Sequence, residues 1–361
     1  MAPRAPSSKR ARARGLSLIE VLVGIAVGLI GILVIFQTLS VWDKFARTTS
    51  SGSDAQTAGT LAVFNLERDL KHAGMGFGTA RTSVMGCPVS SASGPAFALS
   101  PIEISSTPAS GIAGTTQIDV LHGNSAYFVS TETFTTSSAT TKTLRRRGGF
   151  RVGDFIVVAG NDNPASAASA SCALVQVTAA SAPDGRTIDH TTDSSPAFTG
   201  GFAFNLGPGP QFNRWTIGTD NVLRVRNLLA GTEAVVAENV VDLKAEYGVD
   251  LNGDGRIATA ASGPSEWTTT PPADWTRVLA VRIAILVRGR QFEKDVDAPT
   301  AASGAANPQW FGNSFAMRSV DNTADIFTPG DRNSNNWRNY RYRVYERVIP
   351  LRNMVWGTNF E

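Results

Sequence analysis

The chain has 361 residues, of which 42% are hydrophobic and 17% charged, so it can bury a sizeable core and is not intrinsically disordered. Its formal net charge of +3 includes five basic residues close to the N-terminus; without those five the side chains sum to −2, which removes the electrostatic basis for a general affinity for nucleic acid. Low charge with plentiful Gly, Ser, Thr and Ala is typical of a β-rich extracytoplasmic protein.

A basic leader precedes a long apolar segment. From position 16 to position 42 the only ionisable side chain is Glu20. About 20 apolar residues with a rise of 1.5 Å each span the roughly 30 Å hydrocarbon core of a bilayer, so we expect residues 16–42 to form one transmembrane helix. A positive leader without acidic residues predicts a cytoplasmic N-terminus, and therefore a single-pass inner-membrane protein with a periplasmic C-terminal domain. The basic residues of the leader are Arg4, Lys9, Arg10, Arg12 and Arg14.

Glu20 is the fifth residue of the apolar segment. An ordinary secretory signal has a shorter apolar core with a small-residue cleavage site after it, whereas the small residue here, Gly15, comes before it. A carboxylate in hydrocarbon costs roughly 2.5–3.5 kcal/mol and is by default a functional residue that needs a partner. Cleavage after Gly15 would supply one, because the new ammonium group of Leu16 could pair with Glu20 of a neighbouring copy. The alternative is a plain signal anchor in which Glu20 is incidental.

This N-terminus resembles that of the type IV prepilins. Their pattern is a basic leader, a Gly, an apolar first residue of the mature chain and a Glu at mature position five. The matching residues here are Gly15, Leu16 and Glu20. The resemblance implies that residues 1–15 are a leader peptide removed by prepilin peptidase, that Leu16 is then N-methylated, and that Glu20 acts in assembly.

Helical periodicity continues beyond the membrane, over residues 43–74. Residues 43–53 are polar, β-branched and poor in helix propensity, so we expect a bend or a soft stretch there. From Asp54 the spacing predicts an amphipathic helix that packs on a globular domain and ends at a glycine-rich segment, Gly74, Gly76 and Gly78. Its apolar face is predicted to contain Ala62, Val63, Leu66, Leu70 and Ala73, and its polar side Glu67, Arg68, Asp69 and Lys71.

Residues 75–361 change to strand-like periodicity and predict a β-rich globular domain with long loops. The fold class is therefore α+β, with a long transmembrane and amphipathic helix followed by a pilin-like domain. One domain is favoured over two, although residues 79–200 could form a separate lobe. Long connections are expected at 89–116, 161–171, 258–274 and 295–336. Candidate strands are 117–121, 126–130, 154–158, 173–177, 222–226, 234–237, 240–247, 278–287 and 340–349.

The chain contains two cysteines, Cys87 and Cys172, and both follow the membrane segment. In an oxidising periplasm such a pair indicates a disulfide bond. Two separate buried thiols are the alternative.

Few residue patterns suggest chemistry. His72, His122 and His190 lack the spacing of metal ligands, and the sequence contains no nucleophile elbow and no phosphate-binding loop. The three arginines at 145–147 could contact DNA, but a solvated strand end is the favoured interpretation. In residues 340–345 Tyr and Arg alternate up to Arg343 and are followed by Val344 and Tyr345, which favours a strand with one packed and one wet face over a nucleic-acid-binding strand.

One segment does resemble a metal-binding loop. Asp250, Asn252 and Asp254 at positions one, three and five, with Gly255 at six, reproduce the first two-thirds of a calcium loop. We therefore expect calcium to bind those three side chains and the carbonyl oxygen of Arg256, with waters or a carboxylate such as Glu266 completing the shell. Position twelve is Ala261 rather than a bidentate Glu, so an Asx-rich hairpin turn is the alternative.

Later segments resemble the PilW-type minor pilins, at residues 67–74, 240–257, 282–288 and 345–353. The resemblance implies a structural protein rather than an enzyme. It would join other minor pilins and the major pilin of a type IV pilus (fimbrium) in a priming complex at the tip, where a tip adhesin is a further expected partner. A minor pseudopilin of a type II secretion system, and a surface adhesion or DNA-binding pilin, are the alternatives.

Overall fold

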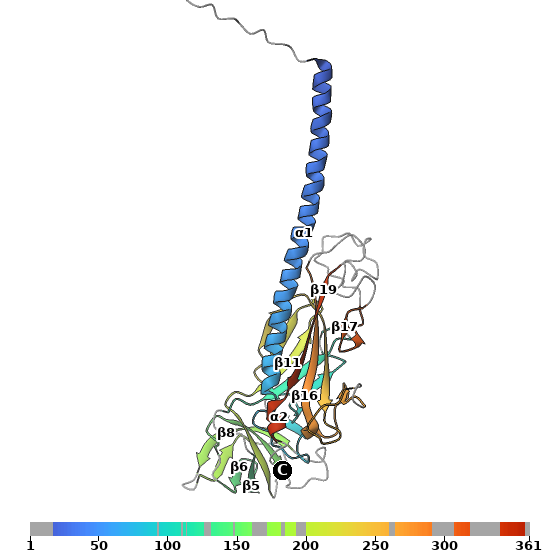
Figure 1. Ribbon diagram of the computed structural model, residues 1–361. Helices are drawn as coiled ribbons and strands as arrows, with labels where there is room; N and C mark the ends of the chain where they lie inside the picture. The colour runs from blue at the N-terminus through green and yellow to red at the C-terminus, as the bar shows by residue number, and fades with distance from the viewer. Residues whose placement is uncertain are drawn as a thin grey trace, which may run out of the picture. The chain divides into compact units, whose positions relative to one another are not determined.

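The structure is a computed structural model, and it describes residues 17–91, 94–109, 111–112, 114–125, 131–146, 149–160, 172–181, 185–192, 200–259, 264–290, 307–317 and 340–357. The chain forms two compact units, Met1–Ser51 and Gly52–Glu361. The first described element is one long helix, α1 (Leu18–His72), which Figure 1 draws as an uninterrupted coil. The predicted strand at 126–130 and the connection at 161–171 lie outside the described residues.

Helix α1 does not break where its propensity is weakest. A bend or soft stretch was expected at residues 43–53, but the helix continues through them. Each residue that extends an existing helix adds one hydrogen bond, whereas starting a new helix fixes several residues for one bond. Poor local propensity in the middle of a helix is therefore tolerated more readily than the sequence suggested.

The part of α1 that belongs to the second unit packs on the β-rich domain with the predicted apolar face. Gly74 follows the helix with a φ of 78°, in the left-handed region that favours glycine, and its N–H donates to the carbonyl oxygen of Leu121 (3.0 Å). The helix end is thus hydrogen-bonded to the sheet below it. The predicted apolar residues Ala62, Val63, Leu66, Leu70 and Ala73 are all buried.

Six strands close into a small barrel, because β8 pairs with β7 on one side and with β9 on the other. The order is β8-β7-β10-β5-β6-β9, with β1 and β2 added outside β8. The interior has its own apolar cluster, which includes Phe134, Ile156 and Val175. The strands are β1 (Pro88–Ser91), β2 (Phe97–Ala98), β5 (Glu132–Ser137), β6 (Thr141–Leu144), β7 (Phe155–Gly160), β8 (Cys172–Ser181), β9 (Thr187–His190) and β10 (Gly201–Gly207).

A five-stranded antiparallel sheet, in the order β13-β12-β11-β4-β3, packs against α1. Its strands β4 and β11 are neighbours in space, yet the whole barrel lies between them in sequence. The strands are β3 (Ile102–Ser105), β4 (Gln117–His122), β11 (Gln211–Ile217), β12 (Leu223–Asn227) and β13 (Glu233–Ala237).

A four-stranded antiparallel sheet, β15-β14-β16-β19, completes the core. Its last strand, β19, lies beside α1 in Figure 1, and the hydroxyl of Tyr345 donates to the carbonyl oxygen of Ala55 (3.3 Å). The elements are β14 (Val240–Val249), β15 (Trp267–Thr268), the 3₁₀ helix η2 (Trp275–Arg277), β16 (Val278–Arg288), the hairpin β17 (Gln309–Trp310) and β18 (Asn313–Ser314), β19 (Tyr342–Pro350) and α2 (Arg352–Gly357).

The observed fold agrees with the predicted α+β class of a long N-terminal helix followed by a β-rich domain. The likeness of that domain to pilins stays a prediction. The segment expected as a long connection at 89–116 contains most of β1 and all of β2 and β3, which is a correction. Short strands of two to four residues carry too little periodicity to be separated from loops by sequence.

Gly59 of α1 lies directly against the ring of Tyr345 in β19. A Cβ added there would overlap the ring of Tyr345, whereas a Cβ at Gly52 in the same helix would meet nothing closer than 3.9 Å. Helix propensity alone favours Ala over Gly by about 0.8–1 kcal/mol. Overpacking a filled site costs about 1–3 kcal/mol, so the two substitutions should change stability in opposite directions.

We therefore expect Gly59→Ala to lower, and Gly52→Ala to raise, the free energy of unfolding of the detergent-solubilised chain. Denaturant titrations of both variants measure this. Combining Gly59→Ala with Tyr345→Ala should remove the penalty attributed to Gly59→Ala alone, because the clashing ring is then absent. Equal stabilisation by both glycine substitutions would show that helix propensity, rather than the contact with Tyr345, decides the outcome.

Candidate functional site

The N-terminal end of α1 is capped by Ser17. Its Oγ accepts a hydrogen bond from the N–H of Ile19 (3.2 Å), and its carbonyl oxygen accepts from the N–H of Glu20 (3.0 Å). Glu20 therefore stands three residues after the cap, where a capping box places Glu. The local sequence signal for this cap is the Ser-x-x-Glu pattern, which the prepilin motif of Gly15, Leu16 and Glu20 does not include. Gly15 and Leu16 lie outside the described residues, so the expected cleavage between them stays a prediction.

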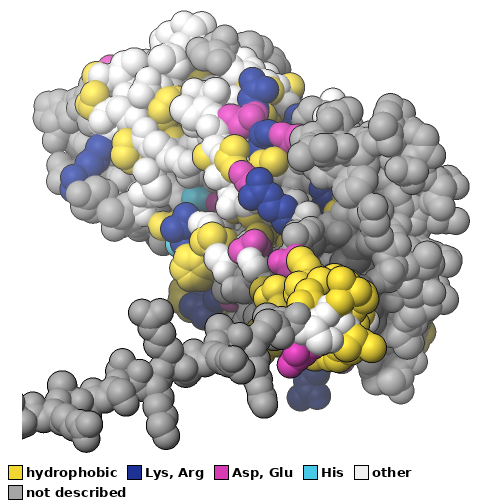
Figure 2. Space-filling view, turned by 90° about the horizontal axis from the view of Figure 1, so that it is seen from above, with side chains coloured by type: hydrophobic (Ala, Val, Ile, Leu, Met, Phe, Trp, Pro, Cys, Tyr) yellow, Lys and Arg dark blue, Asp and Glu magenta, His cyan; other side chains and the backbone are white. Residues whose placement is uncertain are grey.

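Helix α1 begins with a stretch long and apolar enough to cross a membrane, Leu18–Asp43. None of this stretch is buried within the chain, and its large apolar side chains are exposed, for example Leu29, Ile30 and Phe36. Figure 2 shows these side chains as a dense yellow cluster around the helix seen end-on. Exposed apolar area of this size is unfavourable in water. It is consistent with a membrane anchor.

Asp69 is the polar residue that fastens the part of α1 in the second unit to the five-stranded sheet. Its Oδ1 accepts from the side-chain amide of Asn213 (2.9 Å) and lies 3.0 Å from Nε2 of His122, while its Oδ2 accepts from the indole N–H of Trp215 (2.7 Å). The other ring nitrogen of His122 faces the carbonyl oxygen of Gly123 (3.1 Å). Both ring nitrogens of His122 thus lie within hydrogen-bonding distance of an oxygen acceptor.

The position of Asp69 corrects the sequence analysis, which placed it on the polar side of the helix with Glu67, Arg68 and Lys71. Asp69 is only 8% exposed, whereas Arg68 is exposed. A charged side chain can be buried where hydrogen-bonding groups surround it. The three side chains that contact Asp69 all come from strands distant in sequence. Helical spacing carries no information about such partners, so the anchor could not be recognised from the sequence.

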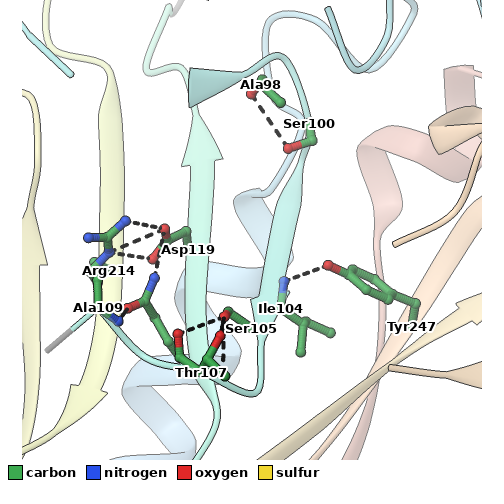
Figure 3. Close-up of polar contacts among 10 residues, drawn as sticks. Ala98, Ser100, Ile104, Ser105, Thr107, Ala109, Asp119, Arg214 and Tyr247 are labelled. Carbon is green, nitrogen blue, oxygen red and sulfur yellow. Dashed lines mark hydrogen bonds and ion pairs between the residues drawn. The ribbon is translucent and has the colours of Figure 1, made fainter. Parts of the chain in front are cut away.

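A second ion pair crosses the middle of the five-stranded sheet (Figure 3). Arg214 on β11 holds both carboxylate oxygens of Asp119 on β4, with Nε–Oδ1 at 2.9 Å and Nη2–Oδ2 at 2.7 Å, and Gln117 also donates to Asp119 (3.2 Å). Burial and the nearby Asp119 raise the pKa of Glu103 on β3, against the influence of Arg214. These side chains neutralise one another across neighbouring strands, which suits a structural role.

The free side of β3 is closed by a tyrosine from the other sheet. The hydroxyl of Tyr247 on β14 accepts a hydrogen bond from the N–H of Ile104 (Figure 3). Burial raises the pKa of Tyr247, so the hydroxyl keeps its proton. The two sheets are thus joined at this point by a hydrogen bond as well as by apolar packing.

The two cationic runs noted in the sequence do not form one basic surface. Arg145 and Arg146 are exposed just after β6, and Arg147 lies outside the described residues. In β19, Tyr342 is buried while Arg343 is exposed, which confirms a strand with one packed and one wet face. On the face seen in Figure 2, basic and acidic side chains alternate. A mixed surface lacks the single-sign field that favours nucleic acid.

The predicted calcium loop lies between β14 and β15. Oδ1 of Asp250 accepts from the N–H of Gly253 (2.7 Å), and its Oδ2 accepts from the N–H of Gly255 (2.8 Å). Buried Glu266 lies against both ends of the loop, accepting from the N–H groups of Leu251 (3.0 Å) and Ala258 (2.7 Å). These contacts fit the Asx-rich turn. The described residues contain no group of three His, Cys, Asp or Glu side chains that could hold a metal ion, so calcium binding stays a prediction.

The two interpretations of the loop differ in a melting experiment. A site without a bidentate Glu should bind calcium with a Kd of about 10⁻⁴ to 10⁻³ M. At about 1 mM calcium this adds about 0.4–1.4 kcal/mol to the free energy of unfolding. We expect the wild type to melt at a higher temperature in calcium than in EDTA. The melting temperature of Asp250→Ala/Asp254→Ala should be the same in both. An equal response of both proteins, or none in either, leaves the hairpin turn as the explanation.

Cys87 and Cys172 form the predicted disulfide bond, with their Cα atoms 6.2 Å apart. Cys87 directly precedes β1 and Cys172 begins β8, and these two strands pair in parallel. The bond therefore fastens the segment that follows α1 to a barrel strand 85 residues further along the chain.

The family model of the Type IV Pilus-assembly protein W matches residues 219–353. The matched segment runs from the last strands of the five-stranded sheet through the whole four-stranded sheet. It includes the PilW-like segments noted at 240–257, 282–288 and 345–353, and it supports a PilW-type pilus protein independently of the N-terminal pattern. No curated protein and no solved structure matches the chain.

Proposed function

We propose that this PilW-type pilus protein is a minor pilin, which helps to prime assembly of a type IV pilus and stays at or near its tip. The observation that carries the proposal is the combination of two separate features on one chain. The C-terminal third matches a pilus-assembly family, and the N-terminus has the prepilin arrangement of Gly15, Leu16 and Glu20 before a membrane-length apolar helix. The two features use different residues, so each supports the other.

The proposed pathway begins in the inner membrane. Prepilin peptidase, acting on the cytoplasmic side, removes residues 1–15, and Leu16 is N-methylated. The carboxylate of Glu20 then pairs with the ammonium group of a neighbouring subunit, which neutralises two charges that are costly in hydrocarbon. The β-rich domain faces the periplasm, and after extrusion it is displayed at the cell surface. The role is structural, with other minor pilins, the major pilin and a tip adhesin as partners.

A minor pseudopilin of a type II secretion system would share this N-terminal logic. Deletion of the gene separates the two proposals, because loss of surface pili with intact protein secretion supports the minor pilin. A surface adhesion or DNA-binding role would require the β-rich domain to bind an adhesion target or DNA directly. Filter binding with duplex DNA tests that alternative, and the alternating charges of Figure 2 argue against strong retention.

Glu20 provides the sharpest test of the proposal. We expect Glu20→Gln to leave the protein stable in the membrane, since a desolvation cost is removed, and to reduce its entry into pili by about 10²-fold, the equivalent of roughly 2.5–3.5 kcal/mol of lost pairing. Quantitative immunoblotting of sheared pili and of membranes measures both. The matched control is Glu67→Gln, which removes a carboxylate from the same helix in the periplasmic unit.

Intact-mass analysis of the same membrane samples tests processing. The wild type should begin at Leu16 and carry one added methyl group, because the peptidase reaches a cytoplasmic Gly15 that signal peptidase on the far side cannot. Retention of residues 1–15 in the mature protein, or normal piliation by the Glu20→Gln strain, would contradict the proposed pathway.

A further inference from the structure

Strand β19 ends the four-stranded sheet, and in the part of the chain that the structure describes only its side toward β16 is paired. The other strands at the ends of described sheets are shorter. β19 has nine residues, against five in β13, four in β3 and two in β2 and β15. A long unpaired edge presents a row of backbone N–H and C=O groups that another chain can extend.

The register shows which groups point outward. Gly289 donates to the carbonyl oxygen of Arg341, and Leu351 donates to that of Leu279, so the odd-numbered residues of β19 bond to β16. In an antiparallel pair, hydrogen-bonded and outward-facing residues alternate. The backbone groups of Val344, Glu346 and Val348 therefore face the open edge.

One end of this row is blocked, and one carbonyl group in its middle is covered by a side chain. Pro350, the next outward position, has no N–H to offer. The carbonyl oxygen of Glu346 is covered by the guanidinium of the adjacent Arg347 (3.0 Å). This contact is with an exposed side chain that can turn away. By comparison, β3 is closed by the buried Tyr247, and β13 is interrupted by a register shift against β12.

The surface beside the open edge is cationic with an apolar patch. Arg343 and Arg347 are both exposed and lie on the helix-facing side of β19, as does Tyr345, whose ring packs on α1. Arg343 and Arg347 are four residues apart, which along a strand is about 13–14 Å. Phe64 on the adjoining helix is 61% exposed. It lies three residues before Glu67, so the two side chains share one face of the helix. The carboxylate of Glu67 lies 3.9 Å from the guanidinium of Arg347.

We propose that the open edge of β19, defined as residues 344–348, binds an extended acidic segment of a partner protein, which adds to the sheet as a fifth strand. Backbone hydrogen bonds from Val344, Glu346 and Val348 supply the pairing, as in other cases of strand addition. Carboxylates four residues apart on the incoming strand meet Arg343 and Arg347, and an apolar side chain covers Phe64. A second copy of this chain fits poorly, because antiparallel pairing about Tyr345 would place Arg343 opposite Arg347.

The test uses the full-length protein in detergent and a fluorescein-labelled peptide, Thr-Glu-Thr-Val-Thr-Glu-Thr, with acetylated and amidated ends, in which Val shares one face with both Glu residues. The Glu residues have the spacing of the two arginines. Fluorescence anisotropy should show binding below about 1 mM, and a peptide with Lys in place of both Glu residues should bind at least tenfold more weakly. Reversal of the charges by Arg343→Glu/Arg347→Glu should weaken binding at least tenfold, whereas Arg226→Glu on the exposed part of the five-stranded sheet should not.

A second pair of variants separates edge pairing from simple charge attraction. Val344→Pro and Val348→Pro remove outward N–H groups without touching the bonds to β16, so peptide affinity should fall at least tenfold in both. Exposed Val348→Pro should keep the melting temperature, whereas Val344 also packs on an apolar cluster, so its variant is measured at a temperature where it stays folded. Unchanged affinity in both Pro variants, or no binding of the acidic peptide up to about 1 mM, would overturn the proposal. The measurement involves no pili, so its outcome is independent of the proposed role in assembly.

Discussion

Replacement of Asp69 by Ala should lower the free energy of unfolding of the β-rich domain by about 3–5 kcal/mol, the range found when one partner of a buried ionic network is removed. The carboxylate meets the buried indole of Trp215 and the part-buried side chains of His122 and Asn213, and without it these polar groups lose their shared partner. Each orphaned donor costs about 1–3 kcal/mol. Denaturant unfolding followed by tryptophan fluorescence measures the loss.

Glu67 offers a matched control, because it lies two residues earlier in the same helix. Its carboxylate pairs with Lys71 (2.6 Å) and lies 3.9 Å from Arg347, in both cases at partly exposed positions. Surface pairs of this kind contribute about 0–1 kcal/mol, so Glu67→Ala should change little. Similar losses in the two variants would show that Asp69 acts as one more surface charge rather than as the anchor of α1.

Loss of the disulfide bond should have a comparable effect. Cys87 and Cys172 close a loop of 85 residues, and the chain-entropy model assigns such a cross-link about 4–5 kcal/mol of stabilisation. The variant Cys87→Ala/Cys172→Ala should unfold at a lower denaturant concentration than the wild type. Reductant should lower the wild-type midpoint toward that of the variant.

Thiol labelling provides the check on this interpretation. The described chain has no free cysteine, so wild-type protein denatured without reductant should show no reactive thiol. A reductant effect of the same size on the double variant would mean that reduction acts elsewhere, and the stabilisation could then not be assigned to this bond.

The helical part of the fold was largely predictable because its signals are local. An apolar run of membrane length and the spacing of Leu66 and Leu70 each report on residues within one or two turns. The predicted strands at 117–121, 240–247 and 278–287 lie within β4, β14 and β16. These strands are long or strongly apolar, which is the pattern that sequence reasoning detects best.

Other strands escaped detection for a physical reason. All seven residues of β10 are buried, so both faces of this strand are covered. Its sequence therefore lacks the alternation of apolar and polar residues by which a half-exposed strand is recognised. In β11 the inner face includes Asn213 and Trp215, whose polar atoms are satisfied by Asp69. Barrel closure depends on pairings such as Val177↔His190, between strands whose own sequences do not specify their neighbours.

The candidate sites divide in the same way. The pattern of Gly15, Leu16 and Glu20 is contiguous and could be read directly, as could the pair of cysteines. The anchor at Asp69 and the open edge of β19 exist only once distant strands are assembled. Sequence alone assigned β19 as a strand but could not show that it ends a sheet.

The place of the barrel in the chain has a consequence for design. β4 and β11 are hydrogen-bonded neighbours, with His122 opposite Gln211, so the chain leaves the five-stranded sheet and re-enters it one strand spacing away, about 4.8 Å. Everything between these two positions, including all six barrel strands, is a cassette with adjacent ends. A foreign domain with closely spaced termini can replace it without rerouting either sheet if two conditions are met. It must cover the main apolar core, to which the barrel strands contribute Val157, Leu174 and Phe204, and Cys87 must be changed because its partner is lost. The matched segment at 219–353 would be untouched by such a graft, which makes the barrel the natural position for displaying cargo on this scaffold.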